Sequence, residues 1–286
     1  MIKIFRNQND HVLQKSDPGD ASASGTTIRV SNFDFDKLFQ SEDPIGLLNQ
    51  FFETTTGTEP ISDSTEQAFL APIGKQEIWA AGVTYFRSRS ARMEESEQSG
   101  GDHFYNLVYE AERPELFFKS TATRARGHLA SVCIRSDSDW NVPEPELTLA
   151  INSHGSIFGY TIGNDMSSRS IEGENPLYLP QAKVYRGSCA IGPCLVVGDA
   201  VNKETEISIT IERNGQQVFS GATNVSQIKR SFKELAEFLF RDNEFPVGAY
   251  LMTGTGVVPD SDFTLQTKDN ISIEIAGIGK LTNTVE

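Results

Sequence analysis

The sequence predicts a β-rich α+β fold in which a small N-terminal α/β domain precedes a larger domain of short strands. Residues 1–74 alternate short apolar clusters with Gly-, Ser- and Thr-rich stretches, and Pro-Ile-Gly at 72–74 is typical of a linker. Over residues 75–286, short apolar runs are separated by glycines and prolines, as in sheet proteins. One convincing segment, residues 231–241, has apolar residues at helical spacing. We therefore expect domains at residues 1–74 and 75–286.

The individual elements follow from local patterns. Residues 1–6 and 78–83 are typical of strands, and residues 87–113 are highly charged, which suggests an exposed helix or a flap. In the predicted helix, Ser231 and Glu234 form a capping-box pattern. Further strands are predicted at residues 115–119, 131–135, 145–152, 157–164, 190–197, 204–213, 217–222 and 271–276.

The composition argues against several classes of function. The chain has 39 acidic and 25 basic residues, and its formal net charge of −14 disfavours a nucleic-acid partner because such a surface repels phosphates. Neither a membrane-spanning apolar run nor a secretory signal is recognisable, so no membrane partner is expected. The 3 cysteines in 286 residues do not indicate a disulfide framework. We expect a cytoplasmic protein with reduced thiols.

The most informative stretch spans residues 142–165. Two runs of alternating apolar residues flank Ser-His-Gly-Ser at 153–156, which is a hairpin turn signal. If His154 and Gly155 form the loop, Ile151 pairs with Phe158, and every further pair keeps the same sum of residue numbers. The face that carries Leu147, Leu149 and Ile151 is then apolar throughout. A slip by one residue would mix the two faces, so the pattern specifies the register.

The same register brings three carboxylates together on the other face of the hairpin. Glu144 lies opposite Asp165, with Cβ atoms about 5 Å apart, and Glu146 lies two residues along the strand. Gly163, opposite Glu146, is expected to leave space for an ion. Oxygen ligands without a nearby His or Cys suit a hard cation such as Mg²⁺, Mn²⁺ or Ca²⁺. The alternative is an acidic hairpin end that faces solvent.

Motifs around this hairpin resemble those of the fumarylacetoacetate hydrolase superfamily. The resemblance covers roughly residues 75–286 and implies a fumarylacetoacetase C-terminal-like mixed β-sandwich or roll. It also implies that Mg²⁺, with Mn²⁺ or Ca²⁺ as alternatives, is held by Glu144, Glu146 and Asp165. The motifs are Gly-Val-Thr-Tyr at 82–85, Leu-Phe-Phe-Lys at 116–119, Pro-Glu-Pro-Glu-Leu at 143–147, Gly-Tyr-Thr-Ile-Gly-Asn-Asp-Met-Ser-Ser-Arg at 159–169, Gln-Ala-Lys at 181–183 and Thr-Gly-Thr-Gly at 253–256.

Within the superfamily, the chain is most similar to the 2-keto-3-deoxy-D-arabinonate dehydratases, through residues 112–119 and 171–185. Hydrolases of the superfamily commonly carry a histidine shortly after the Gly-x-x-Tyr stretch, where it helps to activate water. This chain has 4 histidines, none of them in that stretch: His11, His103, His128 and His154. The resemblance therefore favours dehydration over hydrolysis of a C–C bond.

The resemblance implies a hydro-lyase that converts a 2-keto-3-deoxy sugar acid, a 2-oxo acid, into a semialdehyde, with the metal ion as Lewis acid. Lys183 is the candidate base that takes a proton from C3, and Glu115 is the candidate acid that protonates the C4 hydroxyl as it leaves. Arg87, Ser88 and Thr255 are expected to bind the substrate together with Lys183. Homo-oligomers are common in the family, so one is expected here.

Each of these assignments has an alternative. Lys183 could only neutralise the acidic site, Glu115 could pair with Arg113 or Lys119, and the glycines around Thr255 could form an ordinary turn. The main rival function is a hydrolase or decarboxylase of a 2,4-dioxo acid that uses the same metal ion. A second rival is a protein that binds 2-oxo acids without turning them over.

Overall fold

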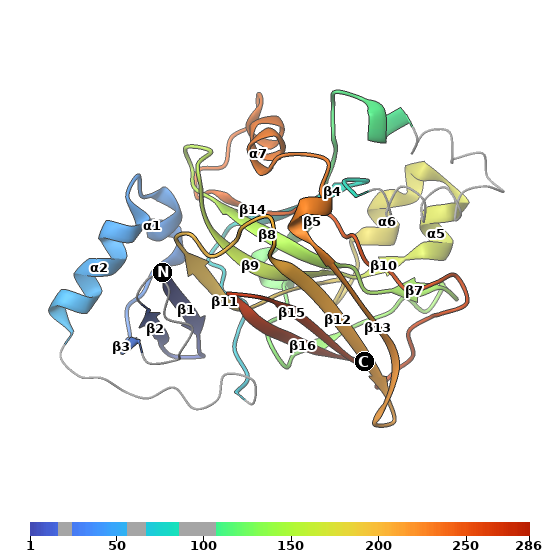
Figure 1. Ribbon diagram of the computed structural model, residues 1–286, viewed down its shortest axis with the longest axis horizontal. Coiled ribbons are helices and arrows are strands. Elements are labelled where there is room, and N and C mark those ends of the chain that lie inside the picture. The colour runs from blue at the N-terminus through green and yellow to red at the C-terminus, as the bar shows by residue number, and fades with distance from the viewer. Residues whose placement is uncertain (17–24, 56–66, 86–106) are drawn as a thin grey trace.

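Strands dominate the secondary structure, and most of them belong to two sheets that pack against each other (Figure 1). The computed structural model describes residues 1–16, 25–55, 67–85 and 107–286. Short helices surround the sheets. The predicted β-rich α+β fold with a sandwich-like arrangement is confirmed.

The larger sheet combines strands from the beginning, middle and end of the chain. Within the described residues its nine strands are, in spatial order, β3 (Thr26–Val30), β2 (His11–Lys15), β1 (Ile2–Arg6), β11 (Cys189–Val197), β9 (Ile157–Asp165), β8 (Pro145–Ile151), β14 (Ala249–Met252), β4 (Glu77–Gly82) and β5 (Glu115–Thr121). β1 pairs antiparallel with β11, and Ile2 lies opposite Val197. Strands from both sides of residue 75 therefore share a sheet, and the domain boundary stays a prediction.

The second sheet covers part of one face of the larger sheet. In the described part of the chain, its five strands are β13 (Gln216–Asn224), β12 (Glu206–Arg213), β15 (Asn270–Ile275), β16 (Gly279–Val285) and β6 (Ser131–Val132), and a separate pair is formed by β7 (Asn141–Val142) and β10 (Ser167–Ser168). Leu147 and Ile162 of the larger sheet share a buried core with Ile209 and Ile273 of the second. Burial of these apolar side chains holds the two layers together.

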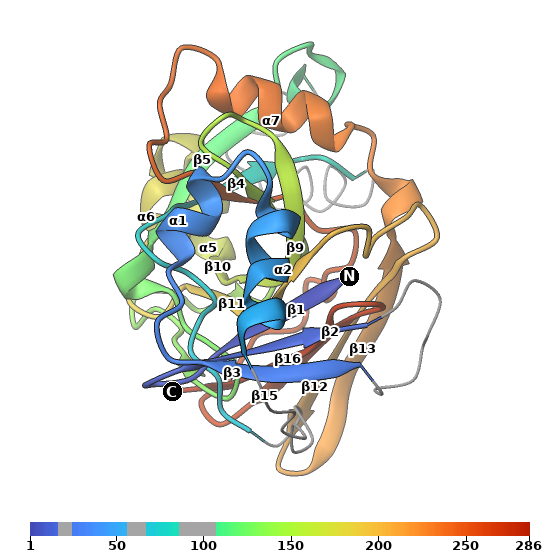
Figure 2. The same cartoon turned by 90° about the vertical axis from the view of Figure 1, so that its left-hand side faces the viewer.

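The five helices named below lie at three places around the sheets, and a short helical turn also spans residues 107–110. α1 and α2 lie beside the N-terminal strands, α5 and α6 lie at the opposite end of the molecule, and α7 lies apart from both pairs (Figures 1 and 2). No helix of the described ranges is long and apolar enough to cross a membrane. The helices are α1 (Phe35–Gln40), α2 (Pro44–Thr54), α5 (Arg169–Glu174), α6 (Leu179–Lys183) and α7 (Phe232–Phe240), and the short 3₁₀ turns are η2 (Ala122–Arg124), η3 (Pro176–Tyr178) and η4 (Val225–Gln227).

The predicted helix at residues 231–241 is confirmed as α7. Ser231 is its N-cap, and its side-chain oxygen accepts a hydrogen bond from the Glu234 N–H at 3.1 Å. The Glu234 carboxylate instead contacts Arg230 at 2.6 Å, so we observe only the Ser231 half of the predicted capping box. The apolar face of α7, with Leu235 and Leu239, packs against the larger sheet and fixes the position of the helix.

The β8–β9 hairpin has the predicted register everywhere except beside its turn. Glu146 pairs with Gly163 and Leu149 with Tyr160, as expected, but Ile151 pairs with Ile157 and not with Phe158. The cause is a longer loop, because the Asn152 side chain accepts hydrogen bonds from the N–H groups of residues 154 and 156. A bulge in β9 absorbs the extra loop residue and restores the register toward the carboxylates.

Candidate metal centre and active site

Three buried carboxylates meet where β8 begins and β9 ends. Glu146 lies within β8, and the Asp165 N–H at the end of β9 donates to the Glu144 carbonyl at 3.0 Å. One oxygen from each of the three side chains lies within 4.8 Å of the others. Glu144 is 4% exposed, Glu146 2% and Asp165 1%. The structure thus brings the three predicted ligands together, and it does so in the protein interior and not on an acidic surface.

Gly163 does not leave space for an ion, contrary to the prediction. A Cβ atom at this position would overlap the Thr148 hydroxyl and would lie 2.9 Å from Cε of Met252. The room beside Gly163 is therefore filled by side chains of β8 and β14. The glycine allows these strands to approach, and it does not provide the room for an ion that was predicted here.

The donor set fits a hard divalent cation. All three ligands are carboxylates, which Mg²⁺ prefers to nitrogen or sulfur ligands. Burial, followed by the nearby charges of Asp165 and Glu144, raises the pKa of Glu146 well above its usual value. A cation placed among the three oxygens would relieve this repulsion. The residues present therefore suit Mg²⁺, with Mn²⁺ and Ca²⁺ as chemically similar alternatives.

Lys183, the last residue of α6, points into the carboxylate cluster and is fully buried. Its Nζ lies 2.5 Å from Glu144 Oε2 and 3.1 Å from Asp165 Oδ2, and it also donates to the Ser167 hydroxyl at 2.5 Å. The ammonium also lies 5.6 Å from the centre of the Phe117 ring. Lys183 is thus held at the centre of the site by contacts with two predicted metal ligands.

Lys119 is a second fully buried lysine, and the sequence reasoning gave it no role in the site. It forms an ion pair with Asp165 and donates hydrogen bonds to the carbonyls of Met166 at 3.0 Å and Lys183 at 2.6 Å. Burial alone would raise the pKa of Asp165, but the charges of Lys119 and Lys183 outweigh it and lower the pKa. The three N–H bonds of Lys119 are directed to these partners, which argues against the alternative that it pairs with Glu115.

Arg169 and Glu172, both on α5, complete the charged cluster. Arg169 Nη2 lies 2.7 Å from Glu144 Oε1, and its Nε lies 3.8 Å from Glu172 Oε2. Glu172 Oε1 in turn lies 3.7 Å from Lys183 Nζ. These two residues were also missed, although a buried carboxylate triad requires compensating cations, and Arg169 ends a motif that contains Asp165.

Glu115 lies on β5 directly opposite Gly82 of β4. A Cβ atom at Gly82 would overlap the Glu115 carboxyl group, so the glycine makes room for that side chain. Side chains two residues apart on a strand share a face, so Glu115 projects from the same face of β5 as Phe117, whose ring lies near Lys183. The candidate acid and the candidate base thus lie on the same side of this strand.

The remaining predicted site residues lie in two segments. Thr255 is buried, and its hydroxyl donates to the Val257 carbonyl at 2.9 Å, which stabilises the local turn. The N–H of the preceding Gly254 donates to Glu146 Oε2 at 2.6 Å, so this turn orients a predicted metal ligand. Arg87 and Ser88 lie outside the described residues.

The sequence of the chain matches a known family. Residues 90–286 match the fumarylacetoacetate (FAA) hydrolase C-terminal family model. This protein belongs to the fumarylacetoacetate hydrolase family. A probable 2-keto-3-deoxyxylonate dehydratase of Haloferax volcanii is 48% identical over 236 residues, which cover 82% of this chain and 80% of the relative. A 2-dehydro-3-deoxy-D-arabinonate dehydratase of Saccharolobus solfataricus is 42% identical over 218 residues, which cover 75% of this chain and 73% of the relative.

Solved structures of family members share the fold over the whole chain. One is a 2-keto-3-deoxy-D-arabinonate dehydratase in its apo form, with a TM-score of 0.80 and 32% sequence identity over 100% of this chain and 98% of that one. Another is the same enzyme complexed with magnesium and 2,5-dioxopentanoate, with a TM-score of 0.78 and 33% identity over the same shares. These fumarylacetoacetate hydrolase family structures agree with the recognition of the fold from sequence motifs.

Proposed function

We propose that this protein is a Mg²⁺-dependent hydro-lyase that dehydrates a 2-keto-3-deoxy sugar acid, such as 2-keto-3-deoxy-D-arabinonate, to a 2-oxo acid semialdehyde. The observation that carries the proposal is the buried cluster in which Lys183 contacts two of three convergent carboxylates. Named dehydratases at 48% and 42% identity support the same reaction class. Elimination of water needs a base and an acid beside a carbonyl-activating group, and Lys183 in the cluster and Glu115 on β5 are the candidates for the two proton-transfer roles.

Glu144, Glu146 and Asp165 would hold the ion, which as a Lewis acid would polarise the 2-oxo group of the substrate. That polarisation makes the C3–H bond of the substrate more acidic. Lys183 is positioned to take the C3 proton, because its Nζ already lies among the ligand oxygens. Proton transfer by a positioned side chain typically contributes about 10²–10⁴-fold to a rate.

The charge of the cluster supports a neutral Lys183 in the working enzyme. When Lys183 is left out of the count, the cluster has two more carboxylates than cations among the described residues. A divalent cation would balance this difference. Release of the Lys183 proton would then leave the cluster without net charge, and the resulting free amine is the form that can accept a proton. The charges counted are those of Glu144, Glu146, Asp165 and Glu172 against those of Lys119 and Arg169.

Glu115 would give a proton to the C4 hydroxyl as the C–O bond breaks. Glu115 is half-buried beside apolar side chains of β5, and such surroundings suit a carboxyl group to the role of a general acid. Its place on the same face of β5 as Phe117 directs it toward Lys183 rather than toward the outer face of the sheet. The substrate would then lie between the two side chains, and Arg87, Ser88 and Thr255 are proposed to contact it.

The test is a product analysis with the Mg²⁺-loaded protein and 2-keto-3-deoxypentonates. Semialdehyde formation is expected, whereas release of pyruvate or CO₂ would reveal the rival hydrolase or decarboxylase, and binding without turnover would reveal the non-catalytic rival. Lys183→Ala should abolish turnover. The matched control is Lys75→Ala, because Lys75 is 83% exposed, and its turnover should equal that of the wild type. Full turnover by Lys183→Ala would refute the assignment of the base.

Several coarser features are part of the same proposal. We propose that the enzyme acts in cytoplasmic sugar-acid catabolism and forms a homo-oligomer, and we retain the division at residue 75. An exposed apolar pair supports self-association, since Leu177 is 83% and Tyr178 38% exposed between α5 and α6. Light scattering of Leu177→Ser would test it, and an oligomer of unchanged size and stability would exclude this pair from the contact.

A further inference from the structure

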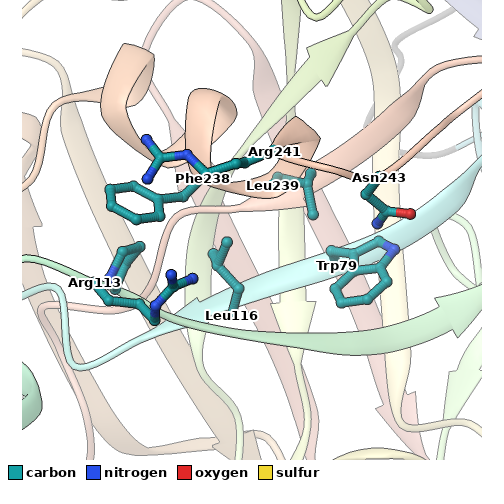
Figure 3. Close-up of a pocket in the computed structure, with 8 residues that line it drawn as sticks. Trp79, Arg113, Leu116, Phe238, Leu239, Arg241 and Asn243 are labelled. Carbon is teal, nitrogen blue, oxygen red and sulfur yellow. The ribbon is translucent and has the colours of Figure 1, made fainter.

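A second pocket lies on the outer side of β4 and β5, beneath α7 (Figure 3). Its volume of about 260 Å³ is slightly below the range of roughly 300–1,000 Å³ that is typical for drug-sized ligands, so it suits a small metabolite. The lining residues are Trp79, Arg113, Pro114, Leu116, Phe238, Leu239, Arg241 and Asn243.

The pocket is separate from the carboxylate cluster. Consecutive residues of a strand point to opposite faces, so Leu116 lines the pocket while the neighbouring Glu115 faces the other side of β5. Trp79 of β4 also faces the pocket. Ala81 pairs with Leu116 and therefore lies on the same face of the sheet, and Trp79 lies two residues from Ala81 on that face. None of the groups assigned to the proposed reaction lines this pocket.

Two exposed arginines flank one end of the pocket. The guanidinium of Arg113 lies 5.5 Å from the centre of the Phe238 ring, and that of Arg241 lies 4.2 Å from it. Within the described ranges, neither guanidinium has an ion-pair partner. Two cations gathered around one ring in a chain with a net charge of −14 repel each other, and an anion between them would remove this repulsion.

Two acidic side chains adjacent to the pocket-lining residues have partners other than the two arginines. Glu77 accepts a hydrogen bond from the Trp79 indole at 2.9 Å, and Glu237 contacts Lys233 at 3.6 Å. The C-terminal end of α7 attracts a cation, which accounts for Arg241 at its C-cap. That attraction does not account for Arg113, which comes from the segment before β5. The convergence of the two therefore points to a ligand.

The rest of the pocket is apolar except at its far end. Leu116 and Leu239 lie between the arginines and Trp79, and the Asn243 carboxamide lies beside Trp79 (Figure 3). A ligand that matches this order has a carboxylate at one end, a short carbon chain and a second polar group at the other end. Inorganic anions lack the chain, and simple fatty acids lack the second polar group.

We propose that this pocket binds a small organic carboxylate with a distal hydroxyl or carbonyl group. The carboxylate lies between Arg113 and Arg241, and the distal group bonds to Asn243. Planar guanidinium groups bind carboxylates through paired, charge-assisted hydrogen bonds, which gives them both strength and direction. This site does not depend on the proposed dehydration, because binding is measured without turnover.

Trp79 provides a direct reporter of binding. The chain has 2 tryptophans, so in the Trp140→Phe protein, excited at a wavelength that tyrosine does not absorb, the tryptophan fluorescence comes from Trp79 alone. Titration of the Mg²⁺-loaded protein with 4-hydroxybutyrate should give a saturable change with a dissociation constant on the order of 1 mM. Butyrate and inorganic phosphate are the matched probes, and each should bind at least about 10-fold more weakly.

Variants then locate the binding. Arg113→Gln and Arg241→Gln should each weaken 4-hydroxybutyrate binding by about 10-fold or more, and Asn243→Leu should remove the preference over butyrate. The control is Lys37→Gln/Lys203→Gln, which removes two exposed positive charges that do not line the pocket and should leave binding unchanged. The proposal is overturned if 4-hydroxybutyrate gives no saturable signal, if phosphate binds equally well, or if both arginine variants bind like the wild type.

Discussion

Replacement of Lys119 by methionine tests how the carboxylate cluster is held in the protein interior. Lys119→Met keeps the length of the side chain but removes the cation that pairs with Asp165. It also removes the donor of two hydrogen bonds, to the carbonyls of Met166 and Lys183. The side chain is 0% exposed and Asp165 is 1% exposed, so water cannot take over these contacts without a local opening.

The expected cost is large because a buried charge loses one of its partners. Removal of one member of a buried ion pair typically costs about 3–5 kcal/mol. For a chain of this size, each kcal/mol shifts the thermal midpoint by about 2–4 °C, so we expect a decrease on the order of 10 °C. The assay is thermal unfolding followed by circular dichroism in EDTA, which prevents a metal ion from replacing the missing charge.

Two further variants show whether the charge is responsible. Lys75→Met removes the exposed pair with Asp36, and pairs of this kind contribute only about 0–1 kcal/mol, so its midpoint should change by less than about 4 °C. Lys119→Met/Asp165→Asn also removes the carboxylate charge that lost its Lys119 partner, and it should recover a large part of the loss. The reasoning would be refuted if Lys119→Met unfolded like Lys75→Met, or if the double variant were no more stable than Lys119→Met.

Three other predictions follow from the same contacts. Mg²⁺ at 100 times its dissociation constant should raise the free energy of unfolding by about 2.7 kcal/mol over the EDTA-treated protein, and Glu146→Gln should lose most of this gain in calorimetry. Gly163→Ala should lower stability by about 1–3 kcal/mol because its Cβ would clash with Thr148 and Met252, but the dissociation constant of Mg²⁺ in titration calorimetry should not change. Burial, followed by the charge of Arg6, lowers the pKa of His11 to about 4. Its contribution to stability should therefore be complete above about pH 6.5 and should be lost as the pH falls through 4. Urea unfolding of His11→Gln at pH 7 and pH 5 checks this, and equal pH dependence in variant and wild type would contradict it.

The hairpin shows what sequence reasoning can predict and where it stops. Alternation of apolar and polar residues specified the register that places Glu144 across from Asp165, because a slip by one residue would have mixed the apolar and polar faces of the hairpin. The predicted pairing beside the turn was wrong by one residue, because hydrogen bonds to the Asn152 side chain reorganise the loop. The alternation of apolar and polar residues carries little information about such side-chain hydrogen bonds. Beyond the bulge, the pattern again determined the pairing.

The surroundings of the carboxylates could not be predicted in the same way. Gly163 was misinterpreted because Met252 reaches it from β14, a strand far away in the sequence. Lys119 and Arg169 were overlooked as parts of the site because their contacts depend on how β5 and α5 pack around the hairpin. The local sequence pattern is enough to predict the strand pairing of one hairpin. The partners of a buried charge depend on the tertiary fold, which that pattern does not determine.

The pairing of β1 with β11 has a consequence for how the protein is made. Ile2 finds its partner Val197 only after more than two thirds of the polypeptide has been synthesised. Until then, the hairpin of β1 and β2 presents an unpaired edge, which is the type of surface that promotes aggregation. Long-range pairings of this kind also slow folding, because a large loop must close before the contacts form. We therefore expect that a nascent chain arrested before residue 189 leaves its first strand available to chaperones or to neighbouring chains.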